Sequence, residues 1–150
     1  CKYISYLLYD EICKGDYNVC DEDIFNILKD FVELFRLYSR SDICASKIDY
    51  LDPSTYKKHS ILYDLYDKYS ILIGDRTSKP YIPPCEILDS LIFYYNDAIS
   101  SHGESDVNFI DKLIELKKLI EVNVLPSKTD CKRFITDFRE TDIEKTRAKE

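Results

Sequence analysis

Apolar residues recur along most of this chain every three or four positions, the spacing of a helix that packs one face against a core. The clearest example is segment 21–40, DEDIFNILKDFVELFRLYSR, in which Asp21 or Asp23 can cap the first turn. The pattern predicts an amphipathic helix on the surface of a helical core. Its core-facing arc is expected to hold Ile24, Ile27, Leu28, Phe31, Leu34, Phe35 and Tyr38.

Further segments carry helical signals, and residues that start or stop helices bound them. They cover 1–13, 53–73, 85–101, 106–125 and 129–140. Pro53 is expected at the first helical position of segment 53–73, and Gly74 just past its end. Segment 74–84 combines prolines with a glycine, so it is expected to be a loop.

The predicted core follows from the apolar arcs of these helices. The residues expected in it are Ile61, Leu62, Leu65, Tyr69, Leu72 and Ile73, then Val107, Ile110, Leu113, Ile114 and Ile120, and finally Cys131, Phe134, Ile135 and Phe138. The opening segment CKYISYLLYDEIC differs, because one side is apolar and tyrosines line the other. A helix that is apolar nearly all round is a buried one, which predicts a central helix. Its apolar arc contains Ile4, Leu7, Leu8 and Ile12.

The composition agrees with a helical fold. The 150 residues include only three glycines and five prolines, too few for the many tight turns of an all-β domain. We therefore expect an all-α fold, a single disulfide-stapled bundle of about six helices that spans residues 1–140. Residues 141–150 are mostly polar and are expected to leave the core, as a C-terminal extension toward a membrane anchor outside this chain.

The six cysteines lie at wide spacings and form no Cys-x-x-Cys pair, which argues against a zinc or iron–sulfur site. An even count at such spacings favours disulfides in an oxidising compartment, with six buried thiols in a cytosolic protein as the alternative. If neighbouring helices are antiparallel, their ends favour one pairing among those that six cysteines allow. That pairing is Cys1–Cys44, Cys13–Cys20 and Cys85–Cys131.

Charge and catalytic motifs restrict the function. A net charge of −7 argues against nucleic-acid and anionic membrane partners, which need a basic face. The sequence contains neither a glycine-rich phosphate loop nor a Gly-x-Ser-x-Gly or His-Glu-x-x-His motif. His59 and His102 are better explained as packed or solvated side chains than as general bases. We expect a non-enzymatic protein with no metal and no cofactor.

Aromatic residues supply the candidate contact sites. The tyrosines of LYDLYDKY (62–69) fall largely with leucines on one side, which predicts a core stripe, and a tyrosine-rich recognition face is the alternative. Phe93 is a sharper anomaly, because its helical position places it among acidic and amide side chains. Leu37 is a similar intruder on segment 21–40. Each covers a second packing layer or is an exposed anchor for a partner.

Several short motifs occur in an order that resembles the Plasmodium interspersed repeat family, the PIR or VIR variant antigens of malaria parasites. A Leu-Tyr-Asp-x-Tyr element of that family matches 65–69, and a cysteine-headed helix ending in Tyr-Asn matches 85–96. Leu7 stands where the family carries tryptophan. The N-terminal motif Cys-x-Tyr…Tyr-Trp-Leu-Tyr-Asp is otherwise matched by Cys1, Tyr3, Tyr6, Leu8, Tyr9 and Asp10. The resemblance covers most of residues 1–100 and thins beyond them.

The resemblance implies a helical ectodomain that the parasite exports and displays on or near the infected erythrocyte. In the full-length family members a transmembrane helix and a short cytoplasmic tail follow. Antigenic variation, binding to a host cell-surface protein and recognition by antibodies are the implied roles, and no catalytic residue is carried over. The alternative is a protein-interaction scaffold inside the parasite or its export compartments, with reduced cysteines and no host receptor.

Loops carry variable contacts on a rigid scaffold. We therefore expect the exposed contact candidates to lie in loops 39–52 and 74–84. The residues singled out are Arg76, Lys79 and Tyr81 in the second loop, together with Phe93 and Leu37 on the helices.

Overall fold

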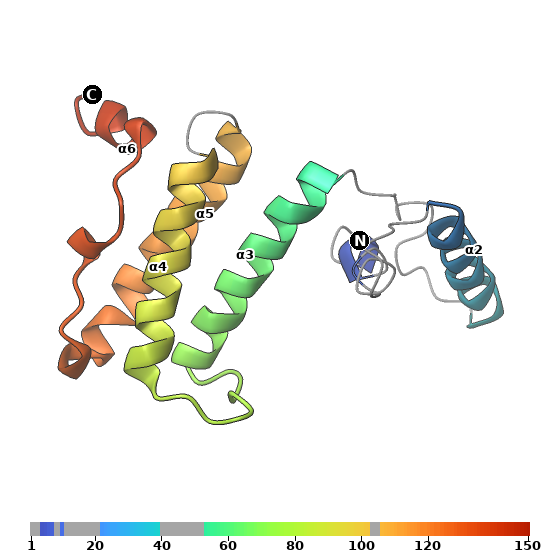
Figure 1. The fold of residues 1–150 in the computed structure, drawn as a ribbon, viewed down its shortest axis with the longest axis horizontal. Coiled ribbons are helices and arrows are strands. Elements are labelled where there is room, and N and C mark those ends of the chain that lie inside the picture. Colours follow the sequence, from blue (N-terminus) through green and yellow to red (C-terminus); the bar gives the residue numbers. More distant parts are fainter. Residues whose placement is uncertain (1–3, 8–9, 11–21, 40–52, 103–105) are drawn as a thin grey trace. The chain divides into compact units, whose positions relative to one another are not determined.

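The computed structural model describes residues 4–7, 10, 22–39, 53–102 and 106–150. All regular secondary structure in these residues is helical, which confirms the all-α fold class. The chain divides into two compact units, Cys1–Ser60 and Ile61–Glu150. The longer helices are α2 (Glu22–Ser39), α3 (Pro53–Leu72), α4 (Pro84–His102) and α5 (Val107–Asn123), and a short α6 (Asp142–Arg147) follows (Figure 1).

In the first unit, α2 has nearly the predicted bounds but a different packed side. Ile27, Phe31 and Leu34, all expected in the core, are 66%, 67% and 66% exposed. Phe25 is fully buried instead. The prediction for the three residues is wrong, because periodicity identifies an apolar face without saying which element covers it. The side chains of Ile24, Phe35, Leu37 and Tyr38 lie outside those that the structure describes.

The opening segment is helical at residues 4–7 and again at Asp10. Leu7, expected in the buried arc, is 42% exposed, whereas Ser5 is buried. In the same unit Tyr6 stacks on Tyr56, with ring centroids 5.5 Å apart, and the Tyr56 hydroxyl donates a hydrogen bond to Asp10 at 2.6 Å. The prediction is therefore wrong at Leu7, and the described contacts of this segment are aromatic and polar.

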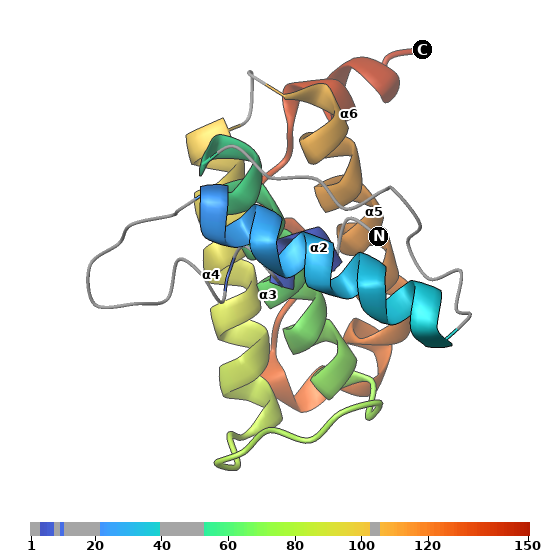
Figure 2. The ribbon, with the colours of Figure 1, turned by 90° about the vertical axis from the view of Figure 1, so that its right-hand side faces the viewer.

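The second unit is built on the C-terminal part of α3 and on α4 and α5, which run in alternating directions in chain order (Figures 1 and 2). Their facing sides form one apolar core. Tyr95 of α4 is its largest fully buried side chain and meets the Phe138 ring edge-on, with centroids 5.1 Å apart. The other core residues are Leu62, Leu65, Leu72, Ile87, Leu88, Leu91, Ile92, Ala98, Ile99, Phe109, Ile110, Leu113, Ile114, Leu116, Ile120 and Val124.

Residues that start or stop helices lie at the ends of α3 and α5. Pro53 is the first residue of α3, where its fixed φ suits a helix start. Gly74 follows the end of α3 with φ +86°, a left-handed conformation that glycine adopts without a Cβ penalty. The carboxylate of Asp106 caps α5 by accepting a hydrogen bond from the Phe109 amide at 3.1 Å. The predictions for Pro53 and Gly74 are confirmed.

The predicted core arcs of α3 and α5 hold except at their ends. Tyr69 and Ile61 pack against the core while partly buried, as predicted for the apolar arc of segment 53–73. Ile73 and Val107, also expected in the core, are 37% and 60% exposed. Ile73 follows the last residue of α3 and Val107 is the first residue of α5, where the chain leaves the packed part of the bundle.

Residues 129–140 do not form the predicted helix. The helix fails at Lys132, whose φ of 53° is left-handed and cannot continue a right-handed helix. Phe134, expected in the core, is 65% exposed, whereas Phe138 is buried as predicted. Residues 129–141, here called the return segment, run back along α4 (Figure 1). The 3-10 turns after α5 are η1 (Leu125–Ser127), η2 (Thr129–Cys131) and η3 (Ile135–Asp137).

A disulfide fastens the start of the return segment to α4. Cys131 is bonded to Cys85 in the first turn of α4, with the two Cα atoms 5.1 Å apart, which confirms the predicted pairing of these two cysteines. Such a bridge contributes about 2–4 kcal/mol by restricting the unfolded chain. One turn along, Arg133 Nε donates to Asp89 Oδ1 at 2.6 Å. The other predicted pairs, Cys1–Cys44 and Cys13–Cys20, lie outside the described residues.

Asn96 fastens the middle of the return segment. Its Nδ2 donates to the Asp137 carbonyl oxygen at 3.0 Å, and its Oδ1 accepts from the Arg139 amide at 2.7 Å. Asn96 lies on the same helical face as Cys85 and Asp89, because the three are spaced by four and seven residues. The polar side of α4 therefore holds a chain segment.

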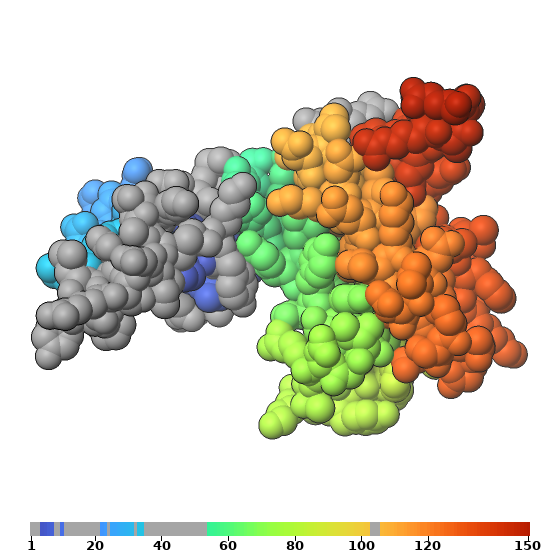
Figure 3. Space-filling view, turned by 180° about the vertical axis from the view of Figure 1, so that it is seen from behind, coloured from blue at the N-terminus to red at the C-terminus, as the bar shows by residue number. Residues whose placement is uncertain are grey.

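The C-terminal helix α6 packs against the rest of the second unit. Thr141 is buried and forms a capping box with Glu144, and Ile143 packs against the core. Lys117 of α5 donates to Glu144 at 2.9 Å, and α5 and the C-terminal residues lie side by side on the surface (Figure 3). The expectation that the chain leaves the core after residue 140 is wrong for residues 141–147, because a capping box and a partly buried ion pair hold α6 in place.

Candidate functional site

Phe93 lies on the solvent side of α4. Its side chain is 66% exposed, and its ring meets the ring of Tyr94 edge-on, with centroids 5.3 Å apart. Tyr94 is itself 48% exposed. Leu91, Ile92 and Tyr95 turn to the core, so the helical geometry directs Phe93 outward. Of the two alternatives for Phe93, an exposed position is the one found in the structure.

A shallow groove with a volume of about 600 Å³ opens beside Phe93. We call it the aromatic groove. It lies between the outer side of α4 and the return segment, both within the second unit. Ile92, which is buried, contributes apolar surface to the groove. The lining includes Asp89, Ile92, Phe93, Tyr94, Arg133 and Asp137.

Carboxylates dominate the charges of the aromatic groove. Arg133 is engaged by Asp89, whose hydrogen bond and charge raise the pKa of the guanidinium, with a smaller contribution from Asp137. The Asp137 Oδ2 accepts a hydrogen bond from the Phe134 amide at 2.7 Å, which orients that carboxylate. Two carboxylates thus surround one guanidinium in the lining.

The aromatic surface already accepts a cation at one edge. Lys68 of α3 places its Nζ 5.2 Å from the centre of the Tyr94 ring, a cation–π contact. The same ammonium group pairs with Asp64 at 2.6 Å. An aromatic face with a carboxylate beside it is therefore a cation-binding arrangement that this molecule uses internally.

The other predicted contact residues lie apart from the groove lining. Arg76, Lys79 and Tyr81 are exposed on the loop between α3 and α4, as predicted, with Tyr81 at 78%. Arg76 forms an ion pair with Asp67. Ser39 is the last residue of α2, and the rest of the predicted loop, residues 40–52, lies outside the described residues, as does the side chain of Leu37.

Phe93 is the only residue of the groove lining that the sequence singled out, and two of the others could not have been placed from the sequence. Arg133 and Asp137 belong to a region where a regular helix was expected, and their position depends on the left-handed Lys132. A left-handed lysine has no sequence signal, because glycine and asparagine are the residues that usually mark this conformation. Phe93 was identifiable, because an aromatic residue on a polar helical face stands out from the periodicity.

The titratable residues of possible catalytic interest are packed side chains. The His102 ring lies edge-on against Phe109, with centroids 5.5 Å apart, and His59 is half-buried in α3. The Tyr95 hydroxyl is buried and has no hydrogen-bond partner among the described residues. Burial, with a further effect from Glu144, raises its pKa. A hydroxyl enclosed in the core is held in its neutral form and is out of reach of a substrate.

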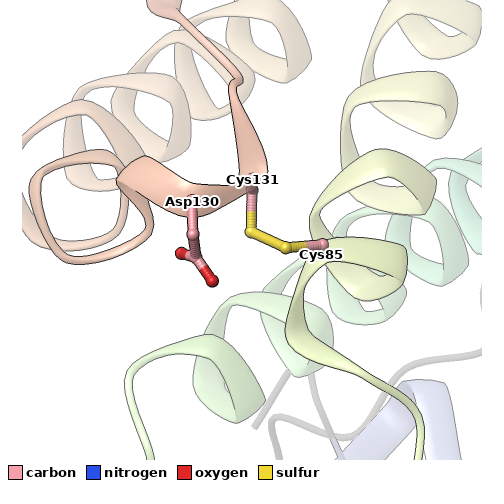
Figure 4. A group of neighbouring side chains, drawn as sticks. All are labelled: Cys85, Asp130 and Cys131. Carbon is pink, nitrogen blue, oxygen red and sulfur yellow. A yellow bond between two sulfur atoms is a disulfide. The ribbon is translucent and has the colours of Figure 1, made fainter.

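Among the residues that the structure describes, one cluster has metal-ligand chemistry. The ligand atoms of Cys85, Asp130 and Cys131 lie within 4.8 Å of one another (Figure 4). The two sulfur atoms are bonded to each other, so neither offers the thiolate that binds a metal. In the disulfide form this cluster is a covalent link with an exposed carboxylate beside it.

Comparison with protein-family models, with curated proteins and with solved structures found no match. The resemblance to the PIR and VIR antigens therefore stays a prediction. In the described part of the chain, the helices are all too short or too polar to cross a lipid bilayer.

Proposed function

We propose that this chain is the extracellular domain of a parasite variant surface antigen of the PIR or VIR type. In this proposal it has no enzymatic activity. It is displayed on or near the infected erythrocyte, where it binds a host cell-surface protein, evades antibodies by sequence variation, or does both. A segment outside this chain anchors it to the membrane.

The observation that carries a binding role is the aromatic groove on a disulfide-linked helical unit. Exposed aromatic side chains such as Phe93 and Tyr94 are enriched in protein interfaces and dominate their energetics. The Cys85–Cys131 disulfide supports an oxidising compartment and disfavours the intracellular scaffold. The assignment to an antigen family rests on the sequence resemblance.

Counting free thiols tests the compartment. Protein isolated from its native source without reductant is denatured and treated with a thiol-specific alkylating reagent, and the attached groups are counted by mass spectrometry. The surface-antigen proposal expects no free thiol among the six cysteines. Six alkylated cysteines would favour the intracellular scaffold.

Binding to host cells tests the function. The 150-residue chain, multimerised to raise avidity, is screened against erythrocyte and endothelial membrane-protein ectodomains. We expect at least one ectodomain to bind and to be competed by the monomeric chain. If all fail and sera from infected hosts recognise the chain, the host-receptor role is wrong and a purely antigenic role remains.

A further inference from the structure

The aromatic groove combines three features that suit one kind of side chain. Ile92 and Phe93 supply apolar surface, Tyr94 supplies a second aromatic ring, and the surrounding charges are mainly acidic. A long aliphatic stem with a cationic head matches this order, because the stem can cover apolar surface while the head meets carboxylates. Arginine and lysine are the side chains with that shape.

The charges favour a basic occupant. Asp89 and Asp137 are the carboxylates of the lining. Asp97 is outside the lining but exposed one turn after Phe93 on α4, so it adds negative charge beside the groove. Arg133 forms an ion pair with Asp89. Within the described part of the chain, neither Asp97 nor Asp137 has a cationic partner at ion-pair distance. Arg139 instead donates to the Ser100 hydroxyl, a turn further along α4.

The molecule already binds a cation in this way at the ring of Tyr94, next to Phe93. Lys68 lies over Tyr94 while its ammonium group pairs with Asp64. Phe93, with Asp97 one turn further along α4 and Asp137 in the same groove lining, offers the corresponding combination on the open side. The net charge of −7 also attracts cationic segments from a distance and opposes association with a second copy of the chain.

We propose that the aromatic groove binds a basic segment of a partner protein, and that an arginine or lysine stem rests on Phe93 with its head among the carboxylates. This proposal deepens the proposed function, because it states the chemistry of the host surface that the domain recognises. The combination of an aromatic anchor with acidic residues gives the groove its specificity for a basic side chain. The affinity depends on the aromatic contact and on the charges.

Selection from a displayed library of random dodecapeptides on the full 150-residue chain tests it. We expect the enriched peptides to be rich in arginine or lysine next to an aliphatic residue. Synthetic copies of them should bind Phe93→Ala about tenfold more weakly than the wild-type chain. Val122→Ala on α5, which removes another exposed apolar side chain, should change binding less than about twofold.

Charge reversal provides the matched electrostatic control. Asp97→Lys should weaken the selected peptides about tenfold, whereas Glu121→Lys, an equal change of net charge on exposed α5, should weaken them less than about threefold. Circular dichroism and thermal unfolding of every variant establish that the fold is retained. Peptides without a basic bias, failure to enrich any peptide, indifference to Phe93→Ala, or self-association through the groove would each overturn the proposal.

The same variants separate this proposal from the proposed function. If a host ectodomain binds the wild-type chain and Phe93→Ala equally, the function stands and the groove is not its site. If basic peptides bind at the groove while every host ectodomain fails, the groove assignment stands and the host-receptor role falls.

Discussion

Asn96 shows how much one polar side chain contributes when both of its functional groups are used. It looks like an ordinary solvent-facing residue in the helical pattern, yet its amide group bonds Asp137 and Arg139 of the return segment. Neither bond belongs to a helix or a strand. The Asn96 side chain therefore supplies hydrogen bonds that a regular helix or strand would supply, along a segment that has only short 3-10 turns.

Replacing Asn96 by alanine tests this role. We expect Asn96→Ala to lower the free energy of unfolding by about 1–3 kcal/mol, because two backbone groups of the return segment lose their partner. Urea denaturation followed by circular dichroism measures the change. Asn108→Ala on the exposed side of α5 is the matched control and should change stability by less than about 0.5 kcal/mol. Equal effects of the two substitutions would contradict the assigned role.

Asp130 carries a charge beside the Cys85–Cys131 disulfide. An attacking thiolate and the departing thiolate are both negative, so this carboxylate opposes reduction of the bond. We expect Asp130→Asn to accelerate reduction, and to do so about threefold more with mercaptoethanesulfonate than with neutral mercaptoethanol. Alkylation of Cys85 and Cys131 with time, followed by mass spectrometry, measures the rates. Asp142→Asn, another exposed carboxylate, should leave both rates unchanged, and equal acceleration with both thiols would refute the electrostatic effect.

At the scale of elements, α6 depends on a small set of polar contacts. Burial alone would raise the pKa of Glu144, but hydrogen bonds from the Thr141 amide and hydroxyl and from Lys117 outweigh it, and the pKa is lowered. The ionised form is therefore favoured in the folded protein. Its contribution to stability is present above the ordinary pKa of a glutamate and is lost as the pH falls through the lower folded value.

Acid should therefore release α6 before the rest of the second unit. We expect amide hydrogen exchange in α6 to increase as the pH falls below about 4, after correction for the intrinsic exchange rate. Glu144→Gln should expose α6 at neutral pH and remove the pH dependence. Glu140→Gln, an exposed glutamate just before α6, is the control. Protection of α6 that does not change with pH in the wild-type chain would exclude this dependence.

For the whole molecule, the division into two units has a direct consequence. Every member of the main apolar core, from Leu62 to Phe138, belongs to the unit Ile61–Glu150. A unit with its own core can fold without the rest of the chain. The Cys85–Cys131 disulfide also lies within it.

A fragment of residues 53–150, which keeps α3 whole, should therefore fold alone. We expect a helical circular dichroism spectrum and a cooperative thermal transition, with the disulfide formed. Reduction should lower the transition temperature, because the chain between the two cysteines, which are 46 positions apart, gains freedom in the unfolded state. A fragment without a cooperative transition in its oxidised form would show that the first unit is needed for the fold.

Much of the architecture was predictable because its causes are local. Pro53, Gly74 and Asp106 act through backbone conformation and through hydrogen bonds to residues within a turn, so they mark helix ends in any context. The leucines and isoleucines of α4 and α5, except the exposed Leu119, are buried where the helical period predicts, since a helix with one apolar face must cover it. Phe93 was identifiable from the same helical period, because it places an aromatic residue on the polar side of α4.

The tertiary structure alone decided the path of residues 129–141 and therefore the second wall of the groove. Their apolar spacing allows a helix. Hydrogen bonds to α4 instead hold Asp137 and Arg133 in a non-helical path, and the partners in α4 are 41 and 44 positions earlier in the chain. The same holds for α2. The sequence identified its apolar face, but only the structure shows which of its side chains are buried. A sequence pattern reports what a segment can form by itself, whereas the choice between a helix and an extended path depends on partners distant in the chain.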